Sequence, residues 1–390
     1  MIKVPTNFSP EFIEEYYNIV SDMVFLNKIN EYNDETAEYR EFKYYLSQNF
    51  LKIITASFND LLDVLTEVNN LYPIISECYN PQKFFKGTDL NEISSILEIM
   101  RIHLRGDANL NRICALKSDA INEISIINRR LQSHYVDFYI SELNNSNDAH
   151  SIKSCCKKIY ATLNDGNIDL EVAPEWVRQL KNIMSYESIP SEVLRKVGDE
   201  LALDYCPMCN ESQVGNIIDE SRVYRQALDH FLPKSKYPIF SLSIYNLIPC
   251  CNTCNSLFKR DKDTLSPPHA NPYVQGSDEH VIFDIEALAL AMLYKKESGS
   301  RVRFIATNTN VDNNIKLFKL LGVYNKRETK RQILRIMSLF NSYYAKWNAT
   351  MTYEEFLVDI VDYDRAKLPY EIIYGKFKMD LLDFMEKVNR

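Results

Sequence analysis

Apolar residues recur at every third or fourth position through most of residues 1–200, the period of an α-helix with one buried face. The pattern begins after Ser9-Pro10, where a serine N-cap and a proline in the first turn predict a helix start. Further helical segments are predicted at about 36–70, 91–103 and 110–143. Residues 144–150 are polar and interrupt the period. We therefore expect a helical domain over 1–200, with a possible subdivision near that loop.

The pattern changes after Asp204, where turn formers, cysteines and β-branched residues replace the helical period. Ser241–Ile248 alternates like a strand, and two short strands are predicted at about 281–285 and 302–307. A basic and amphipathic helical block follows from about residue 313. The predicted fold is mainly α with a small α+β insert: helices over 1–200, a compact unit at 201–280, then short strands and C-terminal helices over 281–390.

Composition indicates a globular protein of two or three domains, with 390 residues, 46% hydrophobic and 25% charged. The first residues lack the apolar core of a signal peptide, and the most apolar run, at about 281–294, is too short to span a bilayer. A cytoplasmic protein without a membrane segment is expected. An odd number of cysteines, nine, fits poorly with a disulfide framework, and clustered cysteines in a reducing compartment more often bind metal.

Charge is distributed unevenly, although the net charge is −8. Residues 1–100 carry 16 acidic and 7 basic side chains, whereas 222–262 carry seven basic and two acidic ones. Residues 301–335 carry nine basic and two acidic side chains. The acidic N-terminal domain is expected to bind a protein partner or to shield the basic C-terminal half. The block at 301–335 either contacts nucleic acid or is the solvated face of an amphipathic helix.

Two CxxC pairs stand 41 residues apart, Cys206-Pro-Met-Cys209 and Cys251-Asn-Thr-Cys254. This spacing lets one turn present two thiolates to a tetrahedral zinc ion, and four thiolates make a closed, structural site. The intervening segment is too long for a simple zinc ribbon, so a folded element is expected between the pairs. Cys250 could replace Cys251 only by breaking the spacing, and we expect it to be a core thiol or a neighbour of the site. The alternative is that all five cysteines are free, buried thiols.

Polar residues with catalytic chemistry lie between and beside these pairs. Phosphodiester hydrolysis needs an activated water and charge stabilisation on the phosphate. His230 can take a proton near neutral pH. Asp229 and Asn255 offer oxygen ligands of the kind that Mg²⁺ or Mn²⁺ prefers. Lysine and arginine suit phosphate contacts of any sequence, and the candidates for nucleic-acid binding are Lys234, Lys236, Lys259, Arg260 and Lys262.

The stretches DHFLPKS at Asp229–Ser235 and NLIPCCNTCN at Asn246–Asn255, with Lys259 beyond, resemble the HNH endonuclease family. The resemblance covers about 206–273. It implies a ββα-metal finger braced by zinc, in which Asn246 ties the loop that holds the histidine, and products with a 5′-phosphate and a 3′-hydroxyl. The sequence departs from the family pattern in two places. Family members often have a lysine three residues after the last asparagine or histidine of the motif, whereas Lys259 lies four residues after Asn255. Some members also have a His-Pro-Tyr element after the finger, whereas here two residues separate His269 from Pro272-Tyr273, and His269 is predicted as a possible accessory residue.

The finger resembles HNH subunits of bacterial anti-phage defence systems such as Septu, which act with an ATPase partner. No glycine-rich phosphate loop occurs in this sequence, so an ATPase would be a separate chain. The sequence thus predicts a metal-dependent HNH endonuclease, most simply on DNA, that serves as a defence effector. Two alternatives remain open. One is a catalytically inactive, zinc-stabilised scaffold that binds nucleic acid, and the other is an HNH nuclease that acts on RNA.

Overall fold

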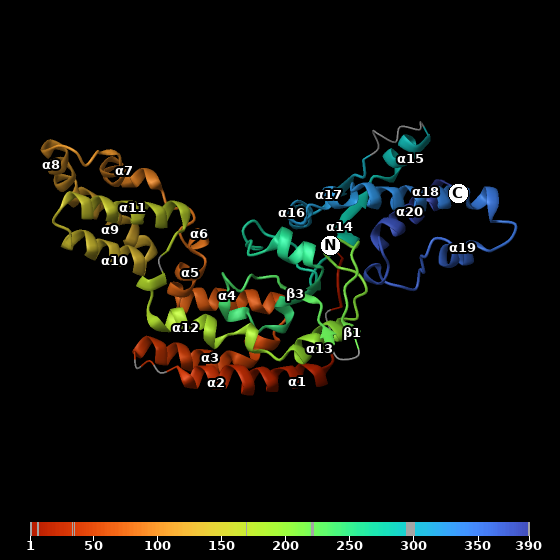
Figure 1. Cartoon of the computed structure of the whole chain (residues 1–390), viewed down its shortest axis with the longest axis horizontal. Coiled ribbons are helices and arrows are strands. Elements are labelled where there is room, and N and C mark those ends of the chain that lie inside the picture. The colour runs from red at the N-terminus through yellow and green to blue at the C-terminus, as the bar shows by residue number, and fades with distance from the viewer. Residues whose placement is uncertain are drawn as a thin grey trace.

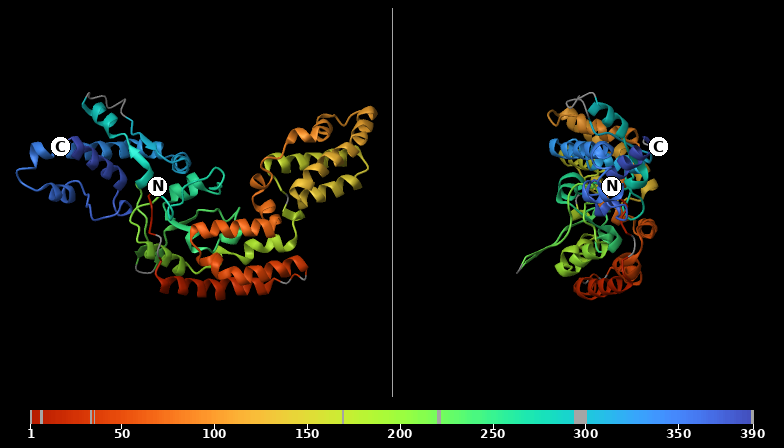
Figure 2. Two further views of the ribbon diagram at one scale, coloured as in Figure 1. Left: turned by 180° about the vertical axis from the view of Figure 1, so that it is seen from behind. Right: turned by 90° about the vertical axis from the view of Figure 1, so that its right-hand side faces the viewer.

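The computed structural model describes residues 2–5, 8–32, 34, 36–168, 170–219, 222–293 and 301–388. Helices dominate, and Figure 1 shows them arranged as a base from which two arms rise. Both arms are also separate in the view from behind in Figure 2. Within the described part of the chain, every helix is too short or too polar to cross a bilayer.

Residues 10–201 build the base and one arm (Figure 1). The base contains α1 Pro10–Ile19, α2 Leu26–Glu31, α3 Ala37–Thr55, α4 Phe58–Leu71, α5 Pro73–Tyr79, α6 Pro81–Phe84, α12 Glu175–Ile183 and α13 Ser191–Leu201. The arm is a bundle of α7 Ser94–Arg101, α8 Asp107–Ala115, α9 Lys117–Leu131, α10 His134–Asn145 and α11 Ala149–Asp165. The predicted helical segments are present, but each of the longer ones is divided into two or more helices.

Side-chain caps explain several of these divisions. Ser9 caps α1 by accepting from the Phe12 amide, with Pro10 in the first turn, as the sequence predicted. The segment predicted over 36–70 breaks where Ser57 caps the start of α4. The polar run at 144–150 contains a short break, at whose end Asp148 caps α11 through the amides of His150 and Ser151.

The second arm is C-terminal. It contains α14 Ser277–His280, β5 Val281–Phe283, α15 Ile285–Leu293, β6 Phe304–Ala306, α16 Thr309–Leu317, α17 Leu320–Tyr324, α18 Arg327–Lys346, α19 Tyr353–Asp359 and α20 Gly375–Val388. Strands β5 and β6 pair antiparallel, in agreement with the two strands that the sequence predicts after residue 280.

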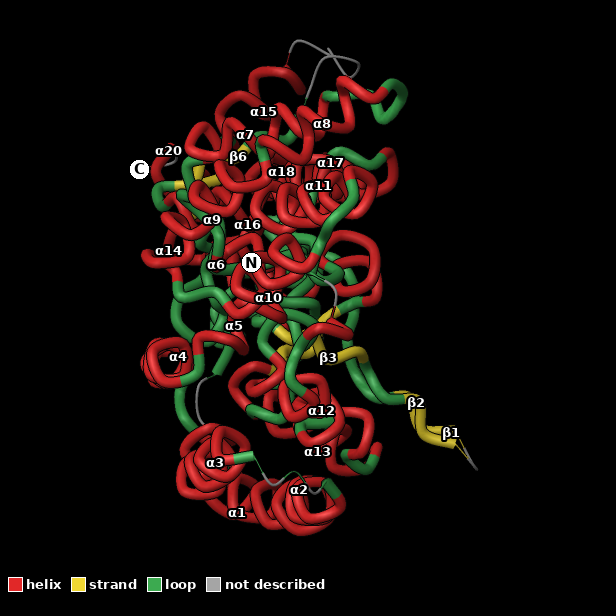
Figure 3. Tube along the Cα trace, turned by 90° about the vertical axis from the view of Figure 1, so that its left-hand side faces the viewer, coloured by secondary structure: helices red, strands yellow, loops and turns green. Residues whose placement is uncertain are grey.

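Between the arms lie two further antiparallel pairs. The pair β1 Ile217–Asp219 and β2 Arg222–Tyr224 projects from the body, as Figure 3 shows. The pair β3 Ala227–His230 and β4 Leu247–Cys250 is followed by a short π-type helix at Thr253–Lys259. The strand predicted over Ser241–Ile248 is present only at its end, where Leu247 and Ile248 begin β4, because a turn and the 3-10 helix at Ile244–Asn246 precede it.

Helices of the base pack directly on the loop between β3 and β4. The Tyr16 hydroxyl donates to the Leu242 carbonyl at 2.9 Å, and the Ser243 hydroxyl donates to the Ile53 carbonyl at 2.6 Å. The Asn80 amide donates to the Tyr237 hydroxyl at 2.9 Å. All of these bonds are buried, and a buried polar group that loses its partner costs about 1–3 kcal/mol. The loop therefore shares one core with residues that precede it by more than 150 positions.

Candidate active site and metal site

The cysteines of the two CxxC pairs converge into one group. Every Sγ atom of this group lies within 4.8 Å of the others, and the members are Cys206, Cys209, Cys251 and Cys254. All are reduced. An ideal tetrahedral zinc–thiolate centre, with Zn–S bonds of about 2.3 Å, has sulfurs about 3.8 Å apart. The Cys209 and Cys251 sulfurs are 4.0 Å apart. This buried, all-thiolate group fits a structural zinc ion, and the predicted set of four is confirmed as a cluster.

A tight loop and the end of β4 position these cysteines. The Asn210 amide donates to the Cys206 carbonyl at 2.8 Å, which closes the turn that carries the first pair. Cys251 directly follows β4, and Cys254 lies in the short helix behind it. A metal ion here would join the loop before β1 to the β4–helix junction, which are far apart in the sequence.

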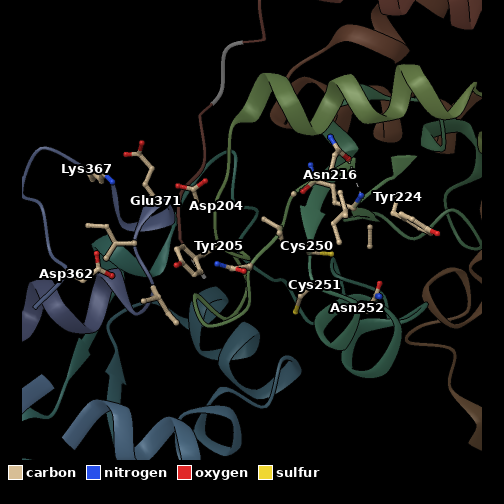
Figure 4. A pocket seen from close by; sticks show the side chains of 18 of the residues that line it. Asp204, Tyr205, Asn216, Tyr224, Cys250, Cys251, Asn252, Asp362, Lys367 and Glu371 are labelled. Atoms are coloured by element: carbon tan, nitrogen blue, oxygen red, sulfur yellow. Dashed lines mark hydrogen bonds between the residues drawn. The ribbon is translucent and has the colours of Figure 1, made fainter. Parts of the chain in front are cut away.

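Cys250 is not a member of the cluster. It lies in β4 opposite Ala227, is 2% exposed, and burial raises the pKa of its thiol. Its side chain lines a cavity of about 970 Å³ between the base of the β1–β2 hairpin and residues 358–373. Figure 4 shows carboxylates such as Asp204 and Glu371 across this cavity from Cys250. Because neither Asp229 nor His230 lines it, this acidic cavity is distinct from the candidate catalytic residues.

Asp229 and His230 are the last two residues of β3. They pair with Ile248 and Leu247 of β4, and successive side chains of a strand point to opposite faces. Both are buried, with 2% and 8% of their surfaces exposed. The residues packed around them therefore determine their hydrogen bonds and their pKa values.

The His230 imidazole is held by a backbone carbonyl. Its Nε2 lies 2.9 Å from the Ser241 oxygen, and a carbonyl oxygen can only accept. Nε2 therefore carries the proton, which leaves the Nδ1 lone pair as the basic position. Burial lowers the pKa of His230 to about 3, so the ring is neutral near pH 7. A neutral imidazole with a fixed tautomer is the form that a general base requires.

Asp229 forms a buried ion pair with Lys259. The Lys259 ammonium is 3.0 Å from Oδ1 and also donates to the His230 carbonyl. The other carboxylate oxygen, Oδ2, is buried without a hydrogen-bond partner in the described part of the chain. Burial raises the pKa of Asp229. An orphaned, buried carboxylate oxygen fits a hard cation, so the residues present are compatible with a divalent ion at this atom.

Lys259 is not where the sequence placed it. It was expected to contact nucleic acid, but it is 1% exposed and its ammonium points inward to Asp229. The reason is the π-type helix, which wraps Lys259 under β3 one turn after Asn255. Lys259 therefore supplies a fixed positive charge inside the site rather than a surface contact.

The two asparagines have different surroundings. Asn246 is fully buried: its Oδ1 accepts from the Leu232 amide at 2.7 Å, and its Nδ2 donates to the Leu232 and Phe240 carbonyls at 3.0 Å each. These bonds close the loop that begins at His230. Asn255 is half-buried in the short helix, and its carbonyl accepts from the Arg260 amide at 2.8 Å. Of these two asparagines, Asn255 is the one whose side chain reaches the surface.

The remaining predicted contacts lie around the loop and the short helix. Lys234 pairs with Glu187, Lys236 is half-buried, and Arg260 and Lys262 are exposed. His269 donates from Nδ1 to the Pro267 carbonyl at 2.7 Å, and burial lowers the pKa of its imidazole. These positions are compatible with a role in phosphate binding, which stays a prediction.

The basic block at 301–335 is partly neutralised within the protein. Lys326 lies 3.1 Å from Glu211, beside the cysteine cluster, and Lys316 pairs with Asp312 at 2.6 Å along α16. Some of this charge therefore stabilises the C-terminal arm, and its contact with nucleic acid stays a prediction.

Sequence reasoning did not find Tyr186, although its ring packs against His230 with 4.5 Å between ring centroids. It also did not find Ser241 as the partner of His230. Tyr186 lies in the link between α12 and α13, in the run Ser185–Ser188, which matches no motif. Its contact depends on how the base folds over the β3–β4 loop, and no local pattern encodes that.

Fold and site together define a mostly helical protein with a four-cysteine cluster that could hold zinc, beside a short β-hairpin. Over 64 residues the chain is 36% identical to the Septu protein PtuB from Bacillus thuringiensis. The match covers 16% of this chain and 24% of that protein, so it spans about a quarter of the curated relative. Searches against family models and against solved structures found no match.

Proposed function

We propose that this protein is a metal-dependent nuclease of the HNH type that cleaves DNA. The observation that carries the proposal is the pair at the end of β3. His230 is neutral with Nδ1 as its basic position, and the adjacent Asp229 keeps a buried oxygen that has no hydrogen-bond partner among the described residues. A base and a cation ligand on consecutive residues are the minimum that hydrolysis of a phosphodiester needs.

In this mechanism the chain's own residues activate water and hold its geometry. Nδ1 of His230 accepts a proton from water while the water oxygen forms a bond to phosphorus, and the bond from phosphorus to the 3′ oxygen breaks. The leaving oxygen takes its proton from solvent, which gives a 5′-phosphate and a 3′-hydroxyl. The Ser241 carbonyl stabilises the ring when it becomes charged. Asn246 fixes the loop, so the base does not have to reorganise during the step.

Asp229 and Asn255 would hold a Mg²⁺ or Mn²⁺ ion, since Asp229 Oδ2 is free and Asn255 lies on the helix that packs against β3. Such an ion supplies charge stabilisation for the phosphate and the leaving oxygen. The four thiolates would hold zinc at a separate, structural position. Lys234, Lys236, Arg260 and Lys262 would contact the phosphate backbone around the site.

We further propose that the nuclease serves as the effector of an anti-phage defence system. The partial similarity to a Septu protein supports this context. The surplus of carboxylates in residues 1–100 suits a protein partner better than nucleic acid, and an ATPase supplied as a separate chain is the partner that we propose.

The decisive experiment is cleavage of supercoiled plasmid DNA with Mg²⁺ or Mn²⁺ by the wild type and by His230→Ala. We expect nicked and linear products from the wild type, a loss of at least 100-fold in the variant, and no activity in EDTA. A matched control is His150→Ala, which removes an exposed imidazole on α11 of the helical arm. Equal cleavage by the wild type and His230→Ala would overturn the assignment of the base.

The two alternative functions are outcomes of the same experiment. If the wild type binds DNA but cleaves neither DNA nor RNA, with or without partner proteins, the chain is a zinc-stabilised scaffold. Cleavage of RNA alone would retain the mechanism and change the substrate. A panel of duplex DNA, single-stranded DNA and RNA, each labelled at one end, separates these outcomes and identifies the product termini.

A further inference from the structure

The link between α12 and α13 touches the β3–β4 loop at three points. The Ser241 hydroxyl donates to the Met184 carbonyl, which fixes the residue whose own carbonyl holds His230. Lys234 of the loop pairs with Glu187 of the link. Between these two points the Tyr186 ring packs against the His230 imidazole. A segment that precedes β3 by some 40 residues thus forms one wall around the candidate base.

Tyr186 is itself fixed on its other sides. Arg225, just before β3, donates from Nη1 to the Tyr186 hydroxyl at 2.9 Å, and its guanidinium lies 5.9 Å from the ring centroid. The Lys234 ammonium lies 5.2 Å from the same centroid. Cation–π contacts of this kind contribute about 0.5–1 kcal/mol each at exposed sites. The phenol ring therefore has a defined orientation relative to the β3–β4 loop.

The hydrogen bond from Nε2 to the Ser241 carbonyl restrains the imidazole at one ring atom. The Tyr186 ring restrains it at a second position, because the two ring planes meet at 79° with centroids 4.5 Å apart. This is the edge-to-face geometry in which aromatic pairs are most favourable. Two contacts at different positions on the imidazole thereby determine the direction of the Nδ1 lone pair.

We propose that Tyr186 is a positioning residue, which aligns His230 so that Nδ1 faces the water that attacks the phosphate. The proposal rests on the function proposed above. Its consequence is that the helical base supplies part of the active site, through a residue that touches neither substrate nor metal. Because general-base catalysis depends on alignment, a loss of this wall lowers the rate of the chemical step more than it lowers substrate binding.

The test compares Tyr186→Leu, which removes the ring, with Tyr186→Phe, which keeps the ring and loses only the bond to Arg225. Tyr72→Leu is the control, since Tyr72 is a half-buried ring of the same base that packs on Phe42 and Trp176 instead. We expect the single-turnover cleavage rate to fall at least tenfold in Tyr186→Leu, with DNA affinity within twofold of the wild type. Tyr186→Phe should restore the rate to within about threefold, and Tyr72→Leu should leave it unchanged.

A second measurement does not depend on cleavage. In protein labelled with ¹⁵N-histidine, the signal that disappears in His230→Ala reports the tautomer of His230. We expect Nε2–H in the wild type and in both variants, because the Ser241 carbonyl sets the tautomer, and a signal that broadens only in Tyr186→Leu, where the imidazole has lost one of its two restraints. An unchanged line width and an unchanged cleavage rate in Tyr186→Leu would overturn the positioning role even if the protein is a nuclease. A broadened signal in a protein that cleaves nothing would retain the contact and refute the nuclease.

Discussion

Lys259 and Asp229 form an ion pair with almost no contact with solvent, at 1% and 2% side-chain exposure. Removing two charges from water is costly, and such a pair is retained only where it has a use or where its removal would leave one charge alone. Here Lys259 binds one oxygen of Asp229, and within the part of the chain that the structure describes the second oxygen has no hydrogen-bond partner. At the scale of single residues, the site therefore combines the fixed ammonium of Lys259 with one carboxylate oxygen of Asp229 that is available to a cation.

The first prediction concerns this pair. Lys259→Met keeps the length of the side chain but leaves the Asp229 carboxylate buried without its cation, so the free energy of unfolding should fall by about 3–5 kcal/mol. Urea denaturation followed by circular dichroism measures it. Lys262→Met, at an exposed lysine of the same region, should change stability by less than about 0.5 kcal/mol. A Lys259→Met protein as stable as the wild type would show that the Asp229 carboxyl group is protonated or is paired with another cation.

At the scale of elements, the cysteine cluster lies where the end of β4 and the short helix meet the loop before β1. The strands are four residues each, too short to be stable alone in water. A structural zinc ion contributes folding free energy directly, and its loss unfolds the elements that it joins. Cys250 and Cys251 are adjacent at the end of β4, and of the two Cys251 belongs to the cluster whereas Cys250 is a buried thiol outside it. Substituting each in turn therefore distinguishes metal binding from the loss of a buried thiol.

The second prediction uses that adjacency. The wild type should contain one zinc ion per chain by elemental analysis, Cys251→Ser should lose it, and Cys250→Ser should retain it. Cys251→Ser should also melt at a lower temperature and become sensitive to protease within 201–260. Loss of zinc from both variants equally would mean that Cys250 contributes a ligand.

The sequence predicted those parts of the site that are local. CxxC spacing identifies the four cysteines of the cluster because each pair is close in sequence. Asp229 and His230 are consecutive residues, so they lie close together in any fold. The direction of Lys259 and the contact of Tyr186 depend on helix type and on packing across 40 residues or more. The strand predicted over Ser241–Ile248 is too long for the same reason. Residues 241–246 are mostly buried in a turn and a 3-10 helix before β4 begins, and a period-2 pattern does not distinguish these from a strand.

At the scale of the whole molecule, Glu77 joins the base to the helical arm. Its carboxylate, on α5, accepts from the amides of His134 and Tyr135 at 3.0 Å each and from the Ser133 hydroxyl, at the start of α10. Glu77 is 1% exposed, and burial raises its pKa above the ordinary value of 4.5. The arm is thus attached through a titratable group inside the protein.

The third prediction is a pH dependence of stability that this group causes. A raised pKa means that the folded state binds the proton more tightly than the unfolded chain does. The contribution of Glu77 to the free energy of unfolding is therefore fully present below pH 4.5 and is lost as the pH rises through the raised pKa. The loss is up to about 1.4 kcal/mol for each unit by which the pKa is raised. Urea unfolding from pH 4 to 8, compared with Glu77→Gln, measures the difference.

The expected difference curve falls with pH and then levels. A curve for Glu77→Gln that rises with pH would show that the helix start, rather than burial, dominates the ionisation of this carboxyl group.

The shared core between the base and the β3–β4 loop limits how such a site can be inherited. Tyr16, Ile53 and Asn80 all bind the loop, so a gene fragment that begins at β1 would encode the motif without the contacts that shape it. Recombination that exchanges the N-terminal helices for another domain would therefore disrupt the loop at the same time. New specificities in relatives built in this way would arise by gradual substitution within one chain rather than by exchange of modules.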